Sequence, residues 1–185
     1  MAYQATLQEM ETALQRIQGS PADNGRLEMI SARPSVGQRK LVEVGELDAE
    51  GGLVGDNWLD RGSSSTADGS ANPEAQITII NTRLIETLAG DKTRWPLAGD
   101  QLFVDIDLSH DNLPPGARLS IGSAVVELTV APHTGCAKFA SRFGHDALRF
   151  VSGPEAMRQR RRGANAKVVR AGKIQVGDIV RKVDA

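Results

Sequence analysis

The sequence of 185 residues has few aromatic residues, a single cysteine and no long apolar run. Aromatic residues amount to 4%, which leaves few flat faces for stacking on the bases of single-stranded nucleic acid. One cysteine excludes an internal disulfide and a zinc site built from several cysteines, and it indicates a reducing compartment. Because no apolar stretch is long enough to span a membrane and no apolar signal segment begins the chain, we expect a cytoplasmic protein without a membrane partner.

The charged residues are distributed unevenly along the chain, although the net charge is only −1. Residues 1–135 hold ten Lys and Arg against nineteen Asp and Glu, whereas residues 136–185 hold twelve against four. The basic part can bind an anion or pair with the acidic part, and a solvated mixed surface would explain the same composition. Since most of the chain is acidic and aromatic residues are scarce, we expect no nucleic-acid partner.

Short β-type runs separated by glycines and prolines follow one N-terminal helix. Four apolar residues repeat at helical spacing within residues 3–18, and Gly19 ends the pattern. We expect this amphipathic segment, residues 1–20, to pack on the rest of the chain or to form a homodimer. The remaining residues, 21–185, predict a mainly β domain, a mainly antiparallel barrel with a few peripheral helices. The strand-like runs are residues 27–32, 40–47, 76–81, 101–108, 117–122, 124–131, 166–172 and 178–183.

Two further helices and two exposed loops interrupt these runs. Asn81 is a favourable N-cap for the helix that follows it, and residues 138–151 are predicted to form one helix that tolerates Gly144. Residues 61–74 are small and polar, which favours an exposed insertion over a mobile lid. Residues 153–163 are strongly basic and are predicted to form the second exposed loop.

Cys136 follows a predicted strand and begins a predicted helix, with His133 and Lys138 close in sequence. A helix N-terminus and nearby cations favour the thiolate, which attacks electrophiles and binds soft metals. A lone cysteine is more often buried and inert, but Pro132 and Gly135 indicate a loop rather than a core strand. Papain-type catalysis would need a histidine, and His133 is the one nearest in sequence.

The basic loop offers a candidate anion site. Guanidinium groups bind phosphate and other oxyanions through paired N–H donors. A solvated loop is the alternative interpretation of the same residues. The cluster consists of Arg158, Arg160, Arg161 and Arg162, followed by Lys167 and Arg170 on a predicted strand.

Five short motifs follow one another along the chain. They are Gly52–Asp56, Leu97–Leu102, Leu119–Gly122, Gly135–Phe139, and Arg162–Val168 with the glycines that follow it. In this order they resemble the MOSC family, the C-terminal domain of molybdenum cofactor sulfurases. The resemblance extends from about Leu27 to Val183, with Gly135 at the position where the family has proline.

The resemblance implies a β-barrel and one functional cysteine, which by position is Cys136, with Lys138 as its cationic neighbour. In the family this cysteine either ligates the molybdenum of the pterin cofactor or carries sulfur as a persulfide. The resemblance also points to the reduction of N-hydroxylated compounds, as in the mitochondrial amidoxime-reducing component. Because the chain has no ferredoxin-like set of cysteines, electrons or sulfur would come from another protein, an electron donor or a desulfurase.

We therefore expect a protein that binds molybdenum cofactor (molybdopterin) through Cys136, the metal ligand, and either reduces N-hydroxylated compounds or handles sulfur for metal–sulfur cofactors. Asp100 and His133 are expected to orient or protonate the substrate beside Cys136. Two alternatives stay open, a persulfide sulfur carrier and a non-catalytic module that binds small anions. The residues expected to hold the cofactor are Cys136, Lys138, Arg142, Arg160, Arg161 and Arg162.

Overall fold

The structure is a computed structural model that describes residues 3–184. Seven strands close into a barrel in the order β11-β7-β8-β9-β5-β6-β1, and β1 pairs back onto β11. Every neighbouring pair is antiparallel except β5 and β6. The predicted mainly antiparallel barrel is therefore confirmed. The barrel strands are β1 (Gly25–Ala32), β5 (Ile77–Asn81), β6 (Leu102–Asp105), β7 (Arg118–Ile121), β8 (Ala124–Leu128), β9 (Ala164–Arg170) and β11 (Ile179–Val183).

Four further strands lie outside the ring of the barrel. β2 (Lys40–Val42) pairs with the end of β1. A small separate sheet has the order β10-β3-β4, formed by β10 (Gly172–Gln175), β3 (Val44–Asp48) and β4 (Gly52–Leu53). The sequence runs indicated β2 and β3 but not β4 and β10, because a two-residue strand and a strand that begins at a glycine give little alternation to detect.

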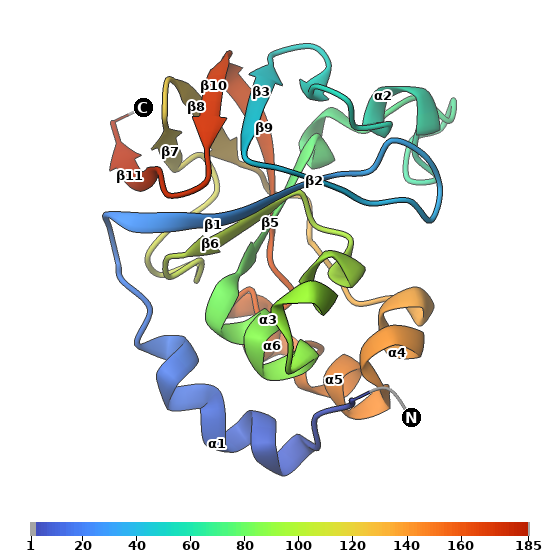
Figure 1. Cartoon of the computed structure of the whole chain (residues 1–185), viewed down its shortest axis with the longest axis vertical. Helices are drawn as coiled ribbons and strands as arrows, with labels where there is room; N and C mark the ends of the chain where they lie inside the picture. Colours follow the sequence, from blue (N-terminus) through green and yellow to red (C-terminus); the bar gives the residue numbers. More distant parts are fainter. Residues whose placement is uncertain (1–2, 185) are drawn as a thin grey trace.

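The protein has two apolar cores, one inside the barrel and one between the barrel and the helices. Strands β5 and β6 contribute side chains to both. Ile79 and Leu102 lie opposite each other in the parallel pair and belong to the barrel interior. The neighbouring Ile80 and Phe103 point the other way, into a second core shared with the helices. Figure 1 shows the helices gathered on one side of the strands, apart from the short helix α2, which lies near β3. The small sheet also packs against the barrel interior, because Leu47, Leu53 and Ile174 belong to the same buried cluster.

The helices have clear sequence signals at most of their ends. Thr6 and Glu9 form a reciprocal capping box at the start of α1. At α3, the side chain of Asn81 accepts a hydrogen bond from Leu84 N, and Gly90 ends the helix with a left-handed φ of 71°. The helices are α1 (Leu7–Gln18), α2 (Trp58–Arg61), α3 (Thr82–Ala89), α4 (Ala137–Phe143), α5 (His145–Phe150) and α6 (Pro154–Arg158), with 3-10 turns η1 (Pro73–Ala75) and η2 (Lys92–Ala98).

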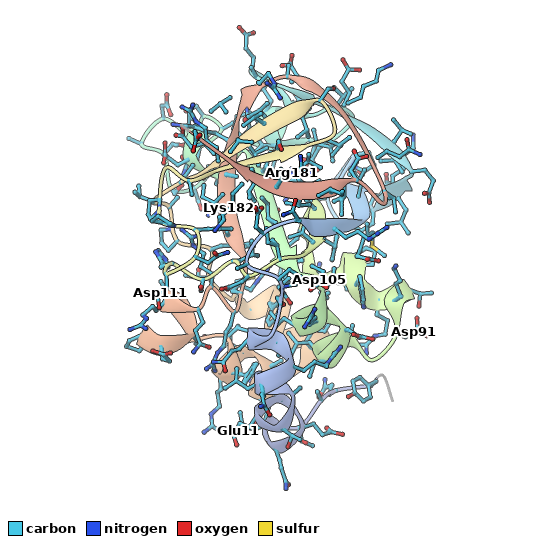
Figure 2. All side chains as sticks on the ribbon, turned by 90° about the vertical axis from the view of Figure 1, so that its left-hand side faces the viewer. Glu11, Asp91, Asp105, Asp111, Arg181 and Lys182 are labelled. Carbon is cyan, nitrogen blue, oxygen red and sulfur yellow. The ribbon has the colours of Figure 1, made fainter. Side chains whose placement is uncertain are left out.

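α1 packs on the helical layer of its own chain. Its Met10 is fully buried in the second core, and α1 contacts α3 and α5. Figure 2 shows Glu11 on α1 at one end of the molecule and Arg181 and Lys182 on the barrel wall toward the other end. Asp105 lies between these regions, where it accepts two hydrogen bonds from Arg83 and so joins β6 to α3.

Two predictions about the C-terminal third are wrong. Residues 138–151 form two helices instead of one, because Gly144 adopts φ 95° and ψ 165°, which lies outside the helical region. Residues 153–163 are not an exposed loop. They contain α6, and the residues after it turn inward, so that Arg160 and Arg162 are only 8% and 6% exposed.

None of the helices in the described part of the chain has the length and apolar character that a bilayer span requires.

Candidate functional site

Cys136 lies in a pocket of about 260 Å³ that is lined by segments far apart in the sequence. We call it the Cys136 pocket. Its walls come from the loop after β1, from α2, from the end of η2 and from the stretch between His133 and Arg142. No carboxylate is among the described residues that line it. The cationic side chains that line it are Arg33, Arg39, Arg61, Lys138, Arg142 and Arg162.

Cys136 is exposed and occupies the N-cap position of α4. Its backbone is extended, with φ −134° and ψ 174°, and its side chain makes no capping hydrogen bond. The preceding Gly135 allows the loop to lie close to α5, because a Cβ at this position would be 2.5 Å from Leu148 Cδ1. The interpretation of Cys136 as a buried cysteine is therefore wrong.

Asp100 joins two of the predicted site residues in a buried cluster. Its side chain is fully buried, and Oδ2 accepts a hydrogen bond of 2.8 Å from Arg162 Nη1. Oδ1 lies 2.6 Å from His133 Nε2. Burial by itself would raise the pKa of Asp100, but the charge of Arg162 and the hydrogen bonds from Arg162 and His133 hold it well below the usual range. Asp100 is therefore ionised at neutral pH.

His133 is neutral in this environment. Burial and the charge of Arg162 lower its pKa below the ordinary value, although the carboxylate of Asp100 opposes the shift. Since ionised Asp100 can only accept, His133 donates from Nε2–H, and its Nδ1 keeps a lone pair. His133 can therefore accept a hydrogen bond from a ligand in the Cys136 pocket, which it lines.

Three arginines of the pocket were not predicted from the sequence. Arg33 forms a bidentate ion pair with Asp56, at 2.8 and 2.9 Å, and both side chains are buried. Arg39 donates to Pro96 O, and burial together with the charges of Arg142 and Arg33 lowers its pKa. Arg33, Arg39 and Arg61 lie in the part of the chain that is acidic on average. The composition of that part therefore gave no indication of a cationic site. The only signal was the motif that contains Asp56, the partner of Arg33.

The sequence model of the MOSC domain matches residues 66–181, more than half of the chain. The chain belongs to the MOSC domain family. No curated protein sequence matches this MOSC protein at a significant level.

Solved structures share the fold of this MOSC protein. The YuaD protein of Bacillus subtilis has a TM-score of 0.65 and 17% identity, and the match covers 84% of this chain and 93% of that one. YiiM from Escherichia coli has a TM-score of 0.56 and 17% identity, with 86% and 70% covered. YiiM from Geobacillus stearothermophilus has a TM-score of 0.53 and 16% identity, with 86% and 75% covered. At this identity the likeness shows the fold alone.

Four of the five motifs of the MOSC chain supply residues that line the pocket or pair with its arginines, whereas the third, Leu119–Gly122, belongs to the barrel strand β7. Asp56 of the first motif pairs with Arg33, Asp100 of the second pairs with Arg162, and Cys136 belongs to the fourth. Gly163 of the last motif has φ 111°, and a Cβ there would be 2.3 Å from Ile79 O and 3.1 Å from His133 Cδ2. Only glycine lets the chain turn here and bring Arg162 beside Asp100.

The structure divides the predicted arginine cluster of the MOSC protein. Arg162 lines the Cys136 pocket, but Arg160 and Arg161 do not. Arg161 donates to Phe150 O and to the side chain of Gln159, and its guanidinium lies 4.6 Å from the Phe150 ring centre. The site residues that the structure brings together are Cys136, His133, Asp100, Lys138, Arg142 and Arg162.

Proposed function

We propose that this MOSC protein binds molybdenum cofactor in the Cys136 pocket, with Cys136 as the protein ligand of the metal, and reduces N-hydroxylated compounds. The observation that carries the proposal is one pocket that combines an exposed thiol with six cationic side chains and, among the described lining residues, no carboxylate. A thiolate is a suitable ligand for a soft metal centre, and guanidinium groups suit the phosphate of the pterin.

The residues of the pocket fit such a group. Arg39 and Arg142 lie close enough for the charge of one to lower the pKa of the other, so a bound polyanion would relieve their repulsion. Arg162 Nε is buried without a hydrogen-bond partner among residues 3–184. Buried donors are rarely left unpaired, which supports a ligand near this side of the pocket. We assign the phosphate to the arginines and the metal to Cys136.

When bound, the cofactor would supply a redox-active metal that accepts oxygen from the substrate. The chain itself would orient the substrate, because His133 Nδ1 can accept a hydrogen bond from the hydroxyl of an N-hydroxylated base. Asp100 would keep the His133 ring in place through Nε2, and Arg162 would keep Asp100 ionised. The reduction consumes two electrons and two protons and releases water, so a separate electron-donor protein would be the partner.

Metal analysis after expression in a host that makes the cofactor tests this proposal. We expect molybdenum in the purified wild-type protein and reductive activity on an N-hydroxylated base with a chemical electron donor. Cys136→Ser should abolish the activity, and Arg39→Gln combined with Arg142→Gln should lower the molybdenum content. Arg149→Gln is the matched control, because Arg149 is exposed and lies outside the pocket. Wild-type protein without molybdenum or activity would refute the proposal.

A persulfide carrier is the second candidate function, because the exposure of Cys136 equally allows a desulfurase to reach its sulfur. Incubation with a desulfurase and cysteine, followed by mass spectrometry, should then show one extra sulfur on the wild type and none on Cys136→Ser. An adduct on protein that lacks molybdenum would favour the carrier. The third interpretation, an anion-binding module without chemistry, would be favoured by a buried, unreactive cysteine, and Cys136 is exposed.

A further inference from the structure

A second pocket adjoins the buried cluster of Asp100, His133 and Arg162. It has a volume of about 200 Å³ and shares only His133 and Arg162 with the Cys136 pocket. We call it the Arg160 pocket. No Asp or Glu is among the described residues that line it. Its polar side includes His110 and Arg160, and its apolar lining consists of Val130, Ala131, Pro132, Val151, Ala156, Met157 and Ala164.

Arg160 is a buried cation without a counter-charge. Its Nη1 donates to the carbonyls of Leu108 and Leu113, at 3.1 and 2.6 Å, whereas Nη2 is buried with no partner in the described structure. None of the ion pairs within residues 3–184 includes Arg160. Burial lowers the pKa of its guanidinium. Buried charges are normally paired, so this arginine requires a functional explanation.

The backbone at Arg160 also departs from the usual preference. Its φ is 46°, and Asn24 is the only other non-glycine residue with positive φ in the described part of the chain. This left-handed conformation favours glycine or asparagine, and a long side chain is retained there only where its surroundings require it. The turn directs the side chain inward from the end of α6, so that it lines the pocket while the exposed Arg158 pairs with Asp111. Figure 2 shows Asp111 at the edge of the molecule.

The net charge of the side chains that line the Arg160 pocket favours a ligand with a single negative charge. Asp100 neutralises Arg162, the other arginine of the lining, through the 2.8 Å ion pair. Partial burial and the charge of Arg160 lower the pKa of His110, so His110 is neutral at neutral pH. His133 is neutral as well. One uncompensated positive charge therefore remains, and a monoanion balances it better than a doubly charged phosphate does.

We propose that the Arg160 pocket binds a small carboxylate that carries a short apolar chain. The carboxylate would accept a hydrogen bond from the unpartnered Nη2–H group of Arg160. Its alkyl part would contact the apolar lining, of which Val130 and Met157 are exposed at the opening. Because apolar walls with a few placed polar groups are typical of small-molecule sites, the pocket has the composition expected for this ligand.

Titration with sodium butyrate tests the proposal, with sodium chloride at the same ionic strength as the reference. We expect saturable binding by calorimetry and a shift of the His110 ring signals in the NMR spectrum of the wild-type protein. Arg160→Gln should weaken butyrate binding about tenfold or more, because it removes a charged donor. Arg149→Gln, which removes an exposed arginine outside the pocket, should leave the affinity unchanged.

A second variant keeps the test decisive if Arg160→Gln does not fold. Met157→Glu changes an exposed lining residue and places a carboxylate at the opening, so it should also weaken butyrate binding about tenfold. Cys136→Ser should bind butyrate like the wild type, which separates this site from the proposed cofactor function. Three results would each overturn the proposal: no saturable binding to the wild type, unchanged affinity in Met157→Glu, or tighter binding of inorganic phosphate than of butyrate.

Discussion

The replacement Asp100→Asn should destabilise the fold strongly, although it changes only one atom of the side chain. Asp100 is fully buried, and its two oxygens accept from Arg162 at 2.8 Å and face His133 at 2.6 Å. Asparagine keeps the shape but removes the negative charge that compensates Arg162, which is itself only 6% exposed. The variant therefore leaves a buried guanidinium without a counter-charge.

The size of the effect follows from the burial of this pair. Breaking a buried ion pair by removing one partner costs about 3–5 kcal/mol. For a protein of this length about 1 kcal/mol shifts the melting temperature by roughly 2–4 °C, so Tm should fall by about 6–20 °C. The exposed pair of Asp111 and Arg158, at 2.9 Å, is the matched control. Asp111→Asn should cost less than about 1 kcal/mol, because surface ion pairs contribute little.

Urea denaturation of Asp100→Asn and Asp111→Asn at neutral pH measures the loss of unfolding free energy in each variant. A double-mutant cycle with Arg162→Met adds the decisive comparison, since removing both charges should recover much of the stability that Asp100→Asn alone loses. If Asp100→Asn costs no more than Asp111→Asn, the reasoning is refuted. If the two substitutions at Asp100 and Arg162 are additive, the ion pair is not the source of the effect.

Three further predictions concern pH, a glycine and a helix cap. His133 has a lowered pKa, so only the unfolded state takes up its proton near the ordinary value of about 6.5, and stability should fall as pH drops from about 7 to 5. Denaturation of His133→Asn across this range should show a smaller slope. Gly163→Ala should cost about 3 kcal/mol or more by the same method, because of its positive φ and the contact with Ile79 O. Asn81→Ala should cost about 2 kcal/mol in thermal unfolding, since it removes the cap on Leu84 N and a buried donor.

The sequence predicted the barrel because its strands have a strong local signal. Most strand-like runs became strands within a few residues, and α3 has both a polar N-cap at Asn81 and a left-handed glycine at Gly90. The break at Gly144 was missed because a glycine inside a helical pattern does not by itself reveal whether its φ is positive. That choice depends on packing, here against the side chain of Gln4, which is remote in sequence.

The sequence predicted those residues of the candidate site that lie in the motifs or close to Cys136 in the chain. Cys136, Asp100 and Arg162 belong to the ordered motifs, and the structure brings them to neighbouring positions. The buried position of Arg160 could not be predicted, because a run of arginines is usually solvated and only the tertiary fold shows which members turn inward. The same limit applies to Arg33, whose partner Asp56 is 23 residues away.

The cations of the Cys136 pocket come from both the acidic and the basic parts of the chain. Three of the six cations in the Cys136 pocket come from the acidic first 135 residues, and three come from the basic remainder. Within that cluster Asp56 and Asp100 each neutralise one arginine, so four positive charges remain for a ligand. The Arg160 pocket retains only one. Two adjoining pockets that share Arg162 should therefore select different ligands by charge alone, a polyanion beside Cys136 and a monoanion beside Arg160.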